Sequence, residues 1–260
     1  MNDAIQMYEE HFLNSRPSLQ TLFYDGWVLR FTDGYPFHEN SVLMLYSSAI
    51  DLHTKIDECE KIYFANKMPV VFRLNSGINR KIDKMFDEKG FAATKNTYAL
   101  ELDLSNSELC NTAIESPPGG GYMISDYPSD DFIKARFDYR NYDEQRKVST
   151  YQLIKNPKSN IKYAQLTVNS YCVAHGSMIV ERDHVVLRNI LVDESHRGKG
   201  YGTSLCTFLL SEAKKMGVHT AILQTFSGNT HALRLYEKLG FRLIYSIWYR
   251  YKYAKNCQGV

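Results

Sequence analysis

Residues 197–202 read Arg-Gly-Lys-Gly-Tyr-Gly, so that three glycines alternate with two cations and a tyrosine. The apolar run from Val185 to Val192 predicts a buried strand before this turn, and the amphipathic stretch after it predicts a helix that ends at Gly217. The first amides of a helix have no backbone partner, the helix dipole favours an anion there, and glycines let that anion come close. The turn therefore predicts a site for a phosphate or pyrophosphate group.

Three kinds of phosphate-binding turn share this outline, and the glycine spacing separates them. A P-loop needs Ser or Thr directly after its Gly-Lys pair, whereas Lys199 is followed by Gly200. A dinucleotide-binding turn needs its third glycine at the position that Thr203 occupies here. The remaining pattern, Arg-x-x-Gly-x-Gly from Arg197 to Gly202, resembles the pyrophosphate loop of the GNAT superfamily of acyl-CoA-dependent N-acyltransferases. A glycine-rich turn on its own also suits a purely structural role.

A second stretch, residues 218–241, makes the resemblance specific. It predicts a strand over 218–225, a Ser-Gly-Asn turn at 227–229 and a helix to Leu239. A Leu-Tyr pair on such a helix is by itself typical of core packing. Here the pair belongs to the family signature Asn-x-x-Ala-x-x-Leu-Tyr-x-x-x-Gly-Phe, which is formed by Asn229, Ala232, Leu235, Tyr236, Gly240 and Phe241.

The resemblance implies a role for each of these segments. The strand before the loop would pair with the pantetheine arm of the coenzyme and turn one backbone amide toward the thioester oxygen, and the loop amides would hold the pyrophosphate. Tyr236 would be the general acid that protonates the leaving thiolate. The residues implied in acetyl-CoA binding are Ile190, Leu191, Val192, Arg197, Gly198, Lys199, Gly200, Tyr201, Gly202, Thr203 and Asn229.

No general base can be assigned from the sequence. Many relatives have a carboxylate on the strand before the loop, but this strand has Asn189, which cannot accept the proton. Asp126, Glu144 and Glu181 remain as alternatives, as does a chain of water molecules. The helices expected at 129–155 would shape the acceptor site, and they contain Phe137, Tyr139, Arg140 and Tyr142.

Composition narrows the class of protein. The formal charge of +2 in 260 residues predicts no nucleic-acid partner. Five cysteines, an odd and widely spaced set, argue against a disulfide framework or a zinc site and favour the cytoplasm. We expect no metal, because the histidines form no His-x-x-x-His pair and read as scattered strand-edge and loop residues. No signal peptide and no membrane span are expected either.

The chain predicts two units and an α+β fold with a mixed sheet. Residues 105–121 are rich in Ser, Asn, Pro and Gly and read as a linker. The catalytic GNAT domain is expected over residues 122–260, with a degenerate GNAT-like unit over 1–104 packed against it. Residues 85–91 align with 235–241, which indicates an internal half-repeat in which Phe86 stands where the second copy has its tyrosine.

The family resemblance implies an N-acetyltransferase that moves the acetyl group of acetyl-CoA to a primary amine of a small molecule or peptide by direct attack. Two other functions stay open, a non-catalytic acyl-CoA-binding regulator and a transferase for a larger acyl donor or an aminoacyl-tRNA. The hydroxyl of Tyr236 favours an enzyme, because a sensor has no use for a proton donor. The near-neutral charge weighs against tRNA.

Overall fold

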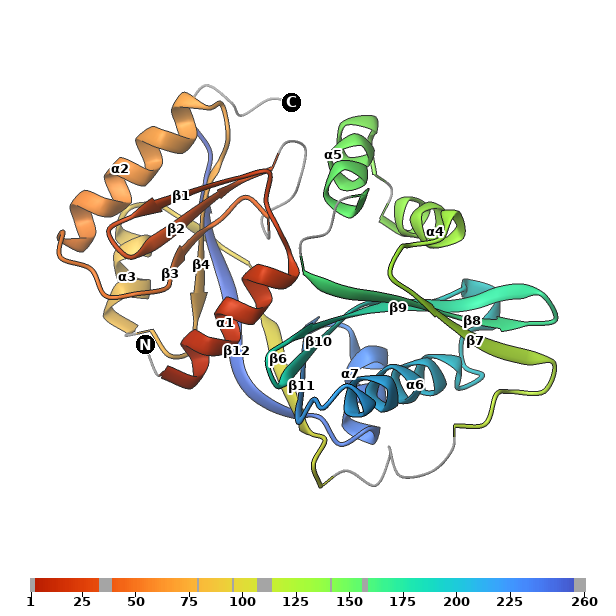
Figure 1. Cartoon of the computed structure of the whole chain (residues 1–260). Coiled ribbons are helices and arrows are strands. Elements are labelled where there is room, and N and C mark those ends of the chain that lie inside the picture. The colour runs from red at the N-terminus through yellow and green to blue at the C-terminus, as the bar shows by residue number, and fades with distance from the viewer. Residues whose placement is uncertain are drawn as a thin grey trace. The chain divides into compact units, whose positions relative to one another are not determined.

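The computed structural model describes residues 3–32, 39–78, 80–94, 96–106, 114–140, 142–155 and 159–254 (Figure 1). It forms two compact units, Met1–Tyr98 with Tyr245–Val260 (unit 1) and Ala99–Ile244 (unit 2). Both units contain parallel and antiparallel strand pairs, so the predicted α+β fold with a mixed sheet is confirmed.

From β7 to α7, unit 2 has the order of elements that the sequence predicts. Its strands lie in the order β6-β11-β10-β9-β8-β7, in which only β10 and β11 are parallel among the pairs with a described register. Figure 1 shows α6 and α7 on one face of these strands and α4 on the other. The elements are β6 (Thr97–Asp103), β7 (Gly120–Ser125), α4 (Asp130–Arg140), α5 (Glu144–Lys155), β8 (Asn160–Val168), β9 (Tyr171–Glu181), β10 (His184–Val192), α6 (Tyr201–Lys215), β11 (Thr220–Phe226) and α7 (Thr230–Lys238).

Unit 1 contains a helix and a hairpin that the sequence did not predict, together with the last strand of the chain. The hairpin β1–β2 begins a sheet of order β1-β2-β3-β4-β12, in which β12 runs antiparallel to β4. Its elements are α1 (Asp3–Ser15), β1 (Gln20–Tyr24), β2 (Trp27–Phe31), β3 (Val42–Met44), α2 (Leu52–Ala65), β4 (Val70–Asn75), α3 (Arg80–Glu88), β5 (Ala92–Ala93) and β12 (Arg242–Lys252). The proposed linker lies partly outside the described residues, which omit 107–113, and the division into domains at 104 and 122 stays a prediction.

The two helix ends aligned in the sequence have the same geometry. In Phe86–Phe91 the last amide donates to the first carbonyl over 2.9 Å, and in Tyr236–Phe241 the same bond is 3.0 Å. Gly90 and Gly240 both have a left-handed φ, 77° and 89°, which closes such a helix end and favours glycine. The strand pairs that come before, β3–β4 and β10–β11, are both parallel. These shared features support the internal half-repeat.

A buried ion pair joins three elements of unit 1. Glu9 of α1 accepts two hydrogen bonds from the guanidinium of Arg73 on β4, at 2.6 and 2.7 Å, and a third from the hydroxyl of Tyr245 at 2.7 Å. Arg73 also donates to the hydroxyl of Tyr249 at 2.7 Å. Because the charges are paired and bonded within the core, removing one partner would leave the other buried and uncompensated. This cluster fixes α1 and β12 on the sheet.

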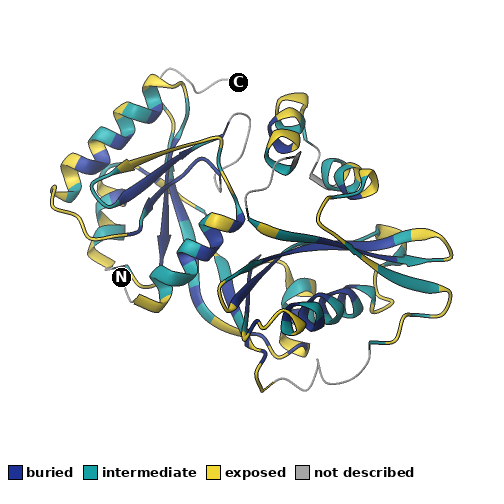
Figure 2. Cartoon of the chain, viewed as in Figure 1, coloured by how far each residue is buried: buried dark blue, intermediate teal, exposed yellow. Residues whose placement is uncertain are grey.

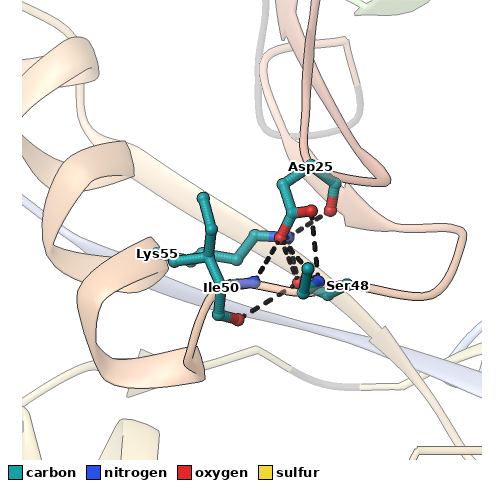
Figure 3. Close-up of polar contacts among 5 residues, drawn as sticks. Asp25, Ser48, Ile50 and Lys55 are labelled. Atoms are coloured by element: carbon teal, nitrogen blue, oxygen red, sulfur yellow. Dashed lines mark hydrogen bonds and ion pairs between the residues drawn. The ribbon is translucent and has the colours of Figure 1, made fainter.

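A second polar cluster closes the loop between β3 and α2 (Figure 3). The carboxylate of Asp25 accepts hydrogen bonds from the hydroxyl of Ser48 at 2.6 Å and from the amides of Ala49 and Ile50 at 3.0 and 2.8 Å. The ammonium of Lys55, whose side chain is fully buried, lies 3.2 Å from the carboxylate and 4.1 Å from the centre of the Trp27 ring. One carboxylate therefore organises the hairpin turn, the loop and the first turn of α2.

Replacing the carboxylate of Asp25 by an amide is expected to weaken the pH dependence of the free energy of unfolding in the acid range. The hydrogen bonds from Ser48 and from the amides of Ile50 and Ala49 hold the pKa of Asp25 below its ordinary value of about 4. The carboxylate thus stabilises the folded state above about pH 4, and the stabilisation is lost as pH falls toward the folded pKa. Asp25→Asn should lower the midpoint of urea unfolding at pH 7, and the difference from wild type should shrink between pH 5 and pH 3.

Glu58→Gln is the control, since Glu58 forms an exposed pair with Lys61 and should change little. An Asp25→Asn variant as stable as wild type at pH 7 would show that the cluster does not hold this loop.

Candidate active site

The predicted glycine turn presents a row of open amides at the start of α6. Gly198 and Gly200 have left-handed φ angles of 78° and 83°, and Gly200 is the N-cap of the helix, without a side-chain cap. The first helical bond runs from the amide of Ser204 to the carbonyl of Gly200, at 3.0 Å. Among the described residues, no group accepts a hydrogen bond from the six amides of residues 198–203. Such a run of unpaired donors at a helix N-terminus is a site for an anion.

The third glycine of the turn, Gly202, allows close packing of α6. A β-carbon on Gly202 would lie 2.9 Å from the Cδ1 of Leu235 and 3.3 Å from the Cγ2 of Val192. Gly202 is buried, so it lets the first turn of α6 approach α7 and the end of β10 closely. One of the three predicted phosphate-loop glycines is therefore explained by packing.

The two cations of the turn are placed differently. Arg197 is half exposed and donates to the carboxylate of Glu194 at 3.0 Å and to the carbonyl of Val192 at 3.4 Å. Lys199 is exposed and has no ion pair with any residue in the described part of the chain. Lys199 is therefore the more available charge. The side chains of Tyr201 and Thr203 are half buried in the first turn of α6.

The strand before the turn carries a β-bulge. Arg188 pairs with Ser177 and Leu191 pairs with His175, so that Asn189 and Ile190 both lie opposite Gly176. Asn189 takes the left-handed φ of 55°, a conformation that asparagine tolerates better than most residues. A β-carbon on Gly176 would lie 2.6 Å from the Cδ1 of Ile190, so a larger residue opposite the bulge would force the Ile190 side chain to move.

Beyond this point β10 separates from its parallel neighbour. The register of β10 with β11 runs from His184 opposite Thr220 to Leu187 opposite Leu223 and ends there. Within the described residues, the backbone of 190–192 therefore makes no ladder with β11, and on that side the carbonyl of Val192 accepts only from Arg197. An extended ligand with amide groups, such as a pantetheine arm, would find hydrogen-bonding partners in this opened ladder.

Tyr236 lies on α7 with its side chain buried. Its ring meets the ring of Phe241 edge-on at 5.7 Å. Burial, with a smaller contribution from Cys206 on α6, holds the pKa of Tyr236 well above its ordinary value, so that the hydroxyl stays protonated at neutral pH. No described residue makes a hydrogen bond with this hydroxyl. Asn229 caps α7, and its Oδ1 accepts from the amide of Ala232 at 3.2 Å. The ligand-binding role of Asn229 stays a prediction.

Of the groups considered as a base, Glu181 ends β9 opposite His184, whereas the bulge lies opposite Gly176. Asp126 is exposed and paired with Lys162, and Glu144 is exposed and bonded to Lys147. Asn189, which lies in the bulge and cannot act as a base, connects the bulge to α4. Its Oδ1 accepts a hydrogen bond from a guanidinium nitrogen of Arg136 on α4 at 2.5 Å. Arg136 carries no local signal in the sequence, and His175 was expected among scattered strand-edge and loop residues. His175 is in fact buried in the middle of β9.

Unit 1 has no counterpart of the open turn. In the half-repeat, the loop between β3 and α2 corresponds to the glycine turn between β10 and α6. There, the carboxylate of Asp25 already accepts hydrogen bonds from the amides of Ala49 and Ile50 (Figure 3). An internal anion therefore occupies the amides that an external anion would use. Phe86 of unit 1 also lacks the hydroxyl of Tyr236.

Comparisons with known proteins agree with the geometry. Residues 122–241 match the Acetyltransferase (GNAT) family. The chain is 24% identical over 254 residues to the uncharacterized N-acetyltransferase YobR of Bacillus subtilis, which covers 96% of this chain and 99% of that protein. A GCN5-related N-acetyltransferase from Kribbella flavida has the same fold, with a TM-score of 0.72, 14% identity, and coverage of 98% of this chain and 96% of its own.

A tandem GNAT protein from the clavulanic acid biosynthesis pathway also shares the fold. Its TM-score is 0.65 at 12% identity, with coverage of 87% of this chain and 78% of its own. None of the helices in the described ranges is long and apolar enough to cross a membrane. Residues 122–241 therefore carry the match to the GNAT acetyltransferase family, and the full-length relative and the structural neighbours are N-acetyltransferases of this type, which supports an acyl-CoA-dependent N-acyltransferase.

Proposed function

We propose that the protein transfers the acetyl group of acetyl-CoA to a primary amine of a small molecule or peptide. The observation that carries this proposal is the row of unpaired amides at residues 198–203, which continues from the opened ladder at residues 190–192. A pyrophosphate on the first and a pantetheine arm along the second would use both sets of hydrogen-bonding groups. The free thiols of Cys59, Cys172 and Cys206 agree with a reducing compartment, and we place the protein in the cytoplasm.

The reaction needs orientation more than it needs reactive side chains. A neutral amine attacks the thioester carbon, the new C–N bond forms, and the C–S bond breaks with loss of the thiolate. Holding the two reactants together contributes about 7–11 kcal/mol at best. A backbone amide near the bulge would stabilise the oxyanion, which is typically worth a few kcal/mol.

Tyr236 is proposed to donate its proton to the departing thiolate sulfur. Because burial raises the pKa of the hydroxyl, Tyr236 keeps its proton throughout the neutral pH range. The proton that the amine loses is proposed to leave through water to solvent, since Asp126 and Glu144 are each paired with a lysine elsewhere. A regulator that only binds acyl-CoA would have no use for this hydroxyl, so Tyr236 favours the transferase over that alternative.

The test of the proposal is a thiol-release assay with acetyl-CoA and a panel of primary amines that includes amino acids, polyamines and short peptides. Release above the rate of hydrolysis with at least one amine supports the transferase. Binding of acetyl-CoA without release for any amine favours the regulator. The same panel is then repeated with longer acyl-CoA donors. Release with these donors and not with acetyl-CoA favours a transferase for a larger acyl group.

Blocking the glycine turn should remove binding of acetyl-CoA. A ligand that binds only the folded state raises the melting temperature. Gly200→Glu places a carboxylate at the open amides and should abolish the rise caused by acetyl-CoA. Gly217→Glu is a matched control at the other end of α6, because both glycines have nearly the same φ, 83° and 82°, and neither would bring a β-carbon within 4 Å of another group. A full rise in Gly200→Glu would place the coenzyme elsewhere.

Removing the tyrosine hydroxyl should affect turnover and spare binding. Tyr236→Phe is expected to keep the thermal shift with acetyl-CoA and to lower kcat by about 10–10³-fold, because only the proton donor is lost. Tyr127→Phe, which removes a hydroxyl from an exposed side chain, is the control and should keep wild-type kcat. Wild-type turnover in Tyr236→Phe would mean that water protonates the thiolate.

A further inference from the structure

A row of polar side chains crosses the sheet of unit 2 beside the bulge. The strand registers align Tyr163 of β8, Ser177 of β9 and Arg188 of β10, and align Gln165 with His175 one step further along β8 and β9. Side chains two residues apart on a strand share a face, so all five lie on the same face of the sheet. Figure 2 shows that the middle of β9 is buried, and the four on β8 and β9 are at most 6% exposed. We call these five residues the polar row.

Helix α4 lies over the polar row. The ring of Phe132 packs edge-on against the rings of Tyr163 and His175, at 5.1 and 4.9 Å. Arg136 follows one turn later on α4 and reaches the bulge, where it donates to Asn189. Gly176 faces the other way, toward Leu205 and Leu209 of α6, which confirms that the polar row and α6 are on opposite faces.

The charge around this row is positive. Arg136 and Arg188 both act on the hydroxyl of Tyr163, opposing the rise in its pKa that burial causes. Burial and the charge of Arg136 lower the pKa of His175 to about 4, so this imidazole is neutral at pH 7 and adds no charge. Arg136 has no carboxylate partner in the described part of the chain, and its buried Nε makes no hydrogen bond. A buried guanidinium donor without an acceptor calls for an anionic partner.

We propose that the polar row, together with Arg136, binds the carboxylate of the acceptor, so that the acceptors are free amino acids. This inference rests on the proposed acetyl transfer. Guanidinium groups bind carboxylates with paired hydrogen bonds, and Tyr163 supplies a neutral hydroxyl beside them. The hydroxyl of Ser177 donates to the carbonyl of Arg188 and accepts from the side-chain amide of Asn189, so it supports the bulge beside this site. In an amino acid the amine is two bonds from the carboxylate. A carboxylate anchored by Arg136 next to Asn189 thus holds the amine beside the bulged strand, where the thioester is expected.

The experiment compares each of the common L-amino acids with its primary amide in the thiol-release assay. The amide keeps the amine and the side chain and removes only the negative charge. For the best substrate, kcat/KM should exceed that of its amide by about 10–100-fold, the range for losing one charged hydrogen bond. Amides that equal or exceed the acids would overturn the proposal.

Arg136→Gln tests the assigned residue. It should lower kcat/KM for the amino acid by about 10–100-fold and leave the amide nearly unchanged, so that the preference for the acid disappears. Arg136→Lys should restore part of the preference, because it restores the charge. Arg146→Gln on α5 is the control. The Nε of Arg146 lies 3.7 Å from a carboxylate oxygen of the exposed Asp143, and this variant should keep the full preference for the acid. An equal loss for acid and amide in Arg136→Gln would mean that the arginine only supports Asn189, and would overturn the proposal.

Titration calorimetry measures binding of the same amino acids and their amides to the protein saturated with coenzyme A, where no acetyl group can be transferred. If no amine is acetylated, the proposed transfer fails. The anion site is still supported if the protein binds the amino acid and not its amide, and if Arg136→Gln weakens binding of the amino acid at least tenfold. Absence of binding, or equal binding of acid and amide, rejects it.

Discussion

The β-bulge at Asn189 and Ile190 is the constraint on which the site depends. Two residues of β10 face one residue of β9, Gly176, whose missing side chain leaves room for Ile190. From the bulge onward β10 no longer pairs with β11. The same irregularity therefore opens the backbone ladder, directs the chain into the glycine turn, and presents Asn189 to α4. The site is built mainly from backbone groups, which explains why few of its side chains need to be reactive.

The half-repeat shows what separates a binding turn from a structural one. Both units have a parallel strand pair and a helix that ends in Gly-Phe with the same bonding. In unit 2 the loop amides remain open, and in unit 1 the carboxylate of Asp25 occupies them while Lys55 neutralises it. Unit 1 keeps the architecture with an internal anion in place of a ligand. The buried pair of Glu9 and Arg73 then ties α1 to the same sheet.

Local patterns in the sequence predicted the elements of unit 2 from β7 to α7 and the glycine turn, because apolar runs and glycines act over a few residues. Features that depend on distant partners were not predicted. The inward face of α1 includes Glu9, which reads as a surface residue until Arg73 and Tyr245 are placed around it. The bulge at Asn189 follows from a strand register, and the burial of His175 follows from the position of α4. Pairing across the sheet supplies this information, and no short window of sequence contains it.

Binding of the coenzyme by the backbone amides of residues 198–203 can be measured by hydrogen exchange with and without acetyl-CoA. Amides without acceptors exchange rapidly in the free protein and slow down when a ligand accepts their hydrogen bonds. We expect strong protection of 198–203 by acetyl-CoA and no change at Ala49 and Ile50, whose amides are already bonded to Asp25. Unchanged exchange at 198–203 under saturating acetyl-CoA, or protection confined to Ala49 and Ile50, would contradict it.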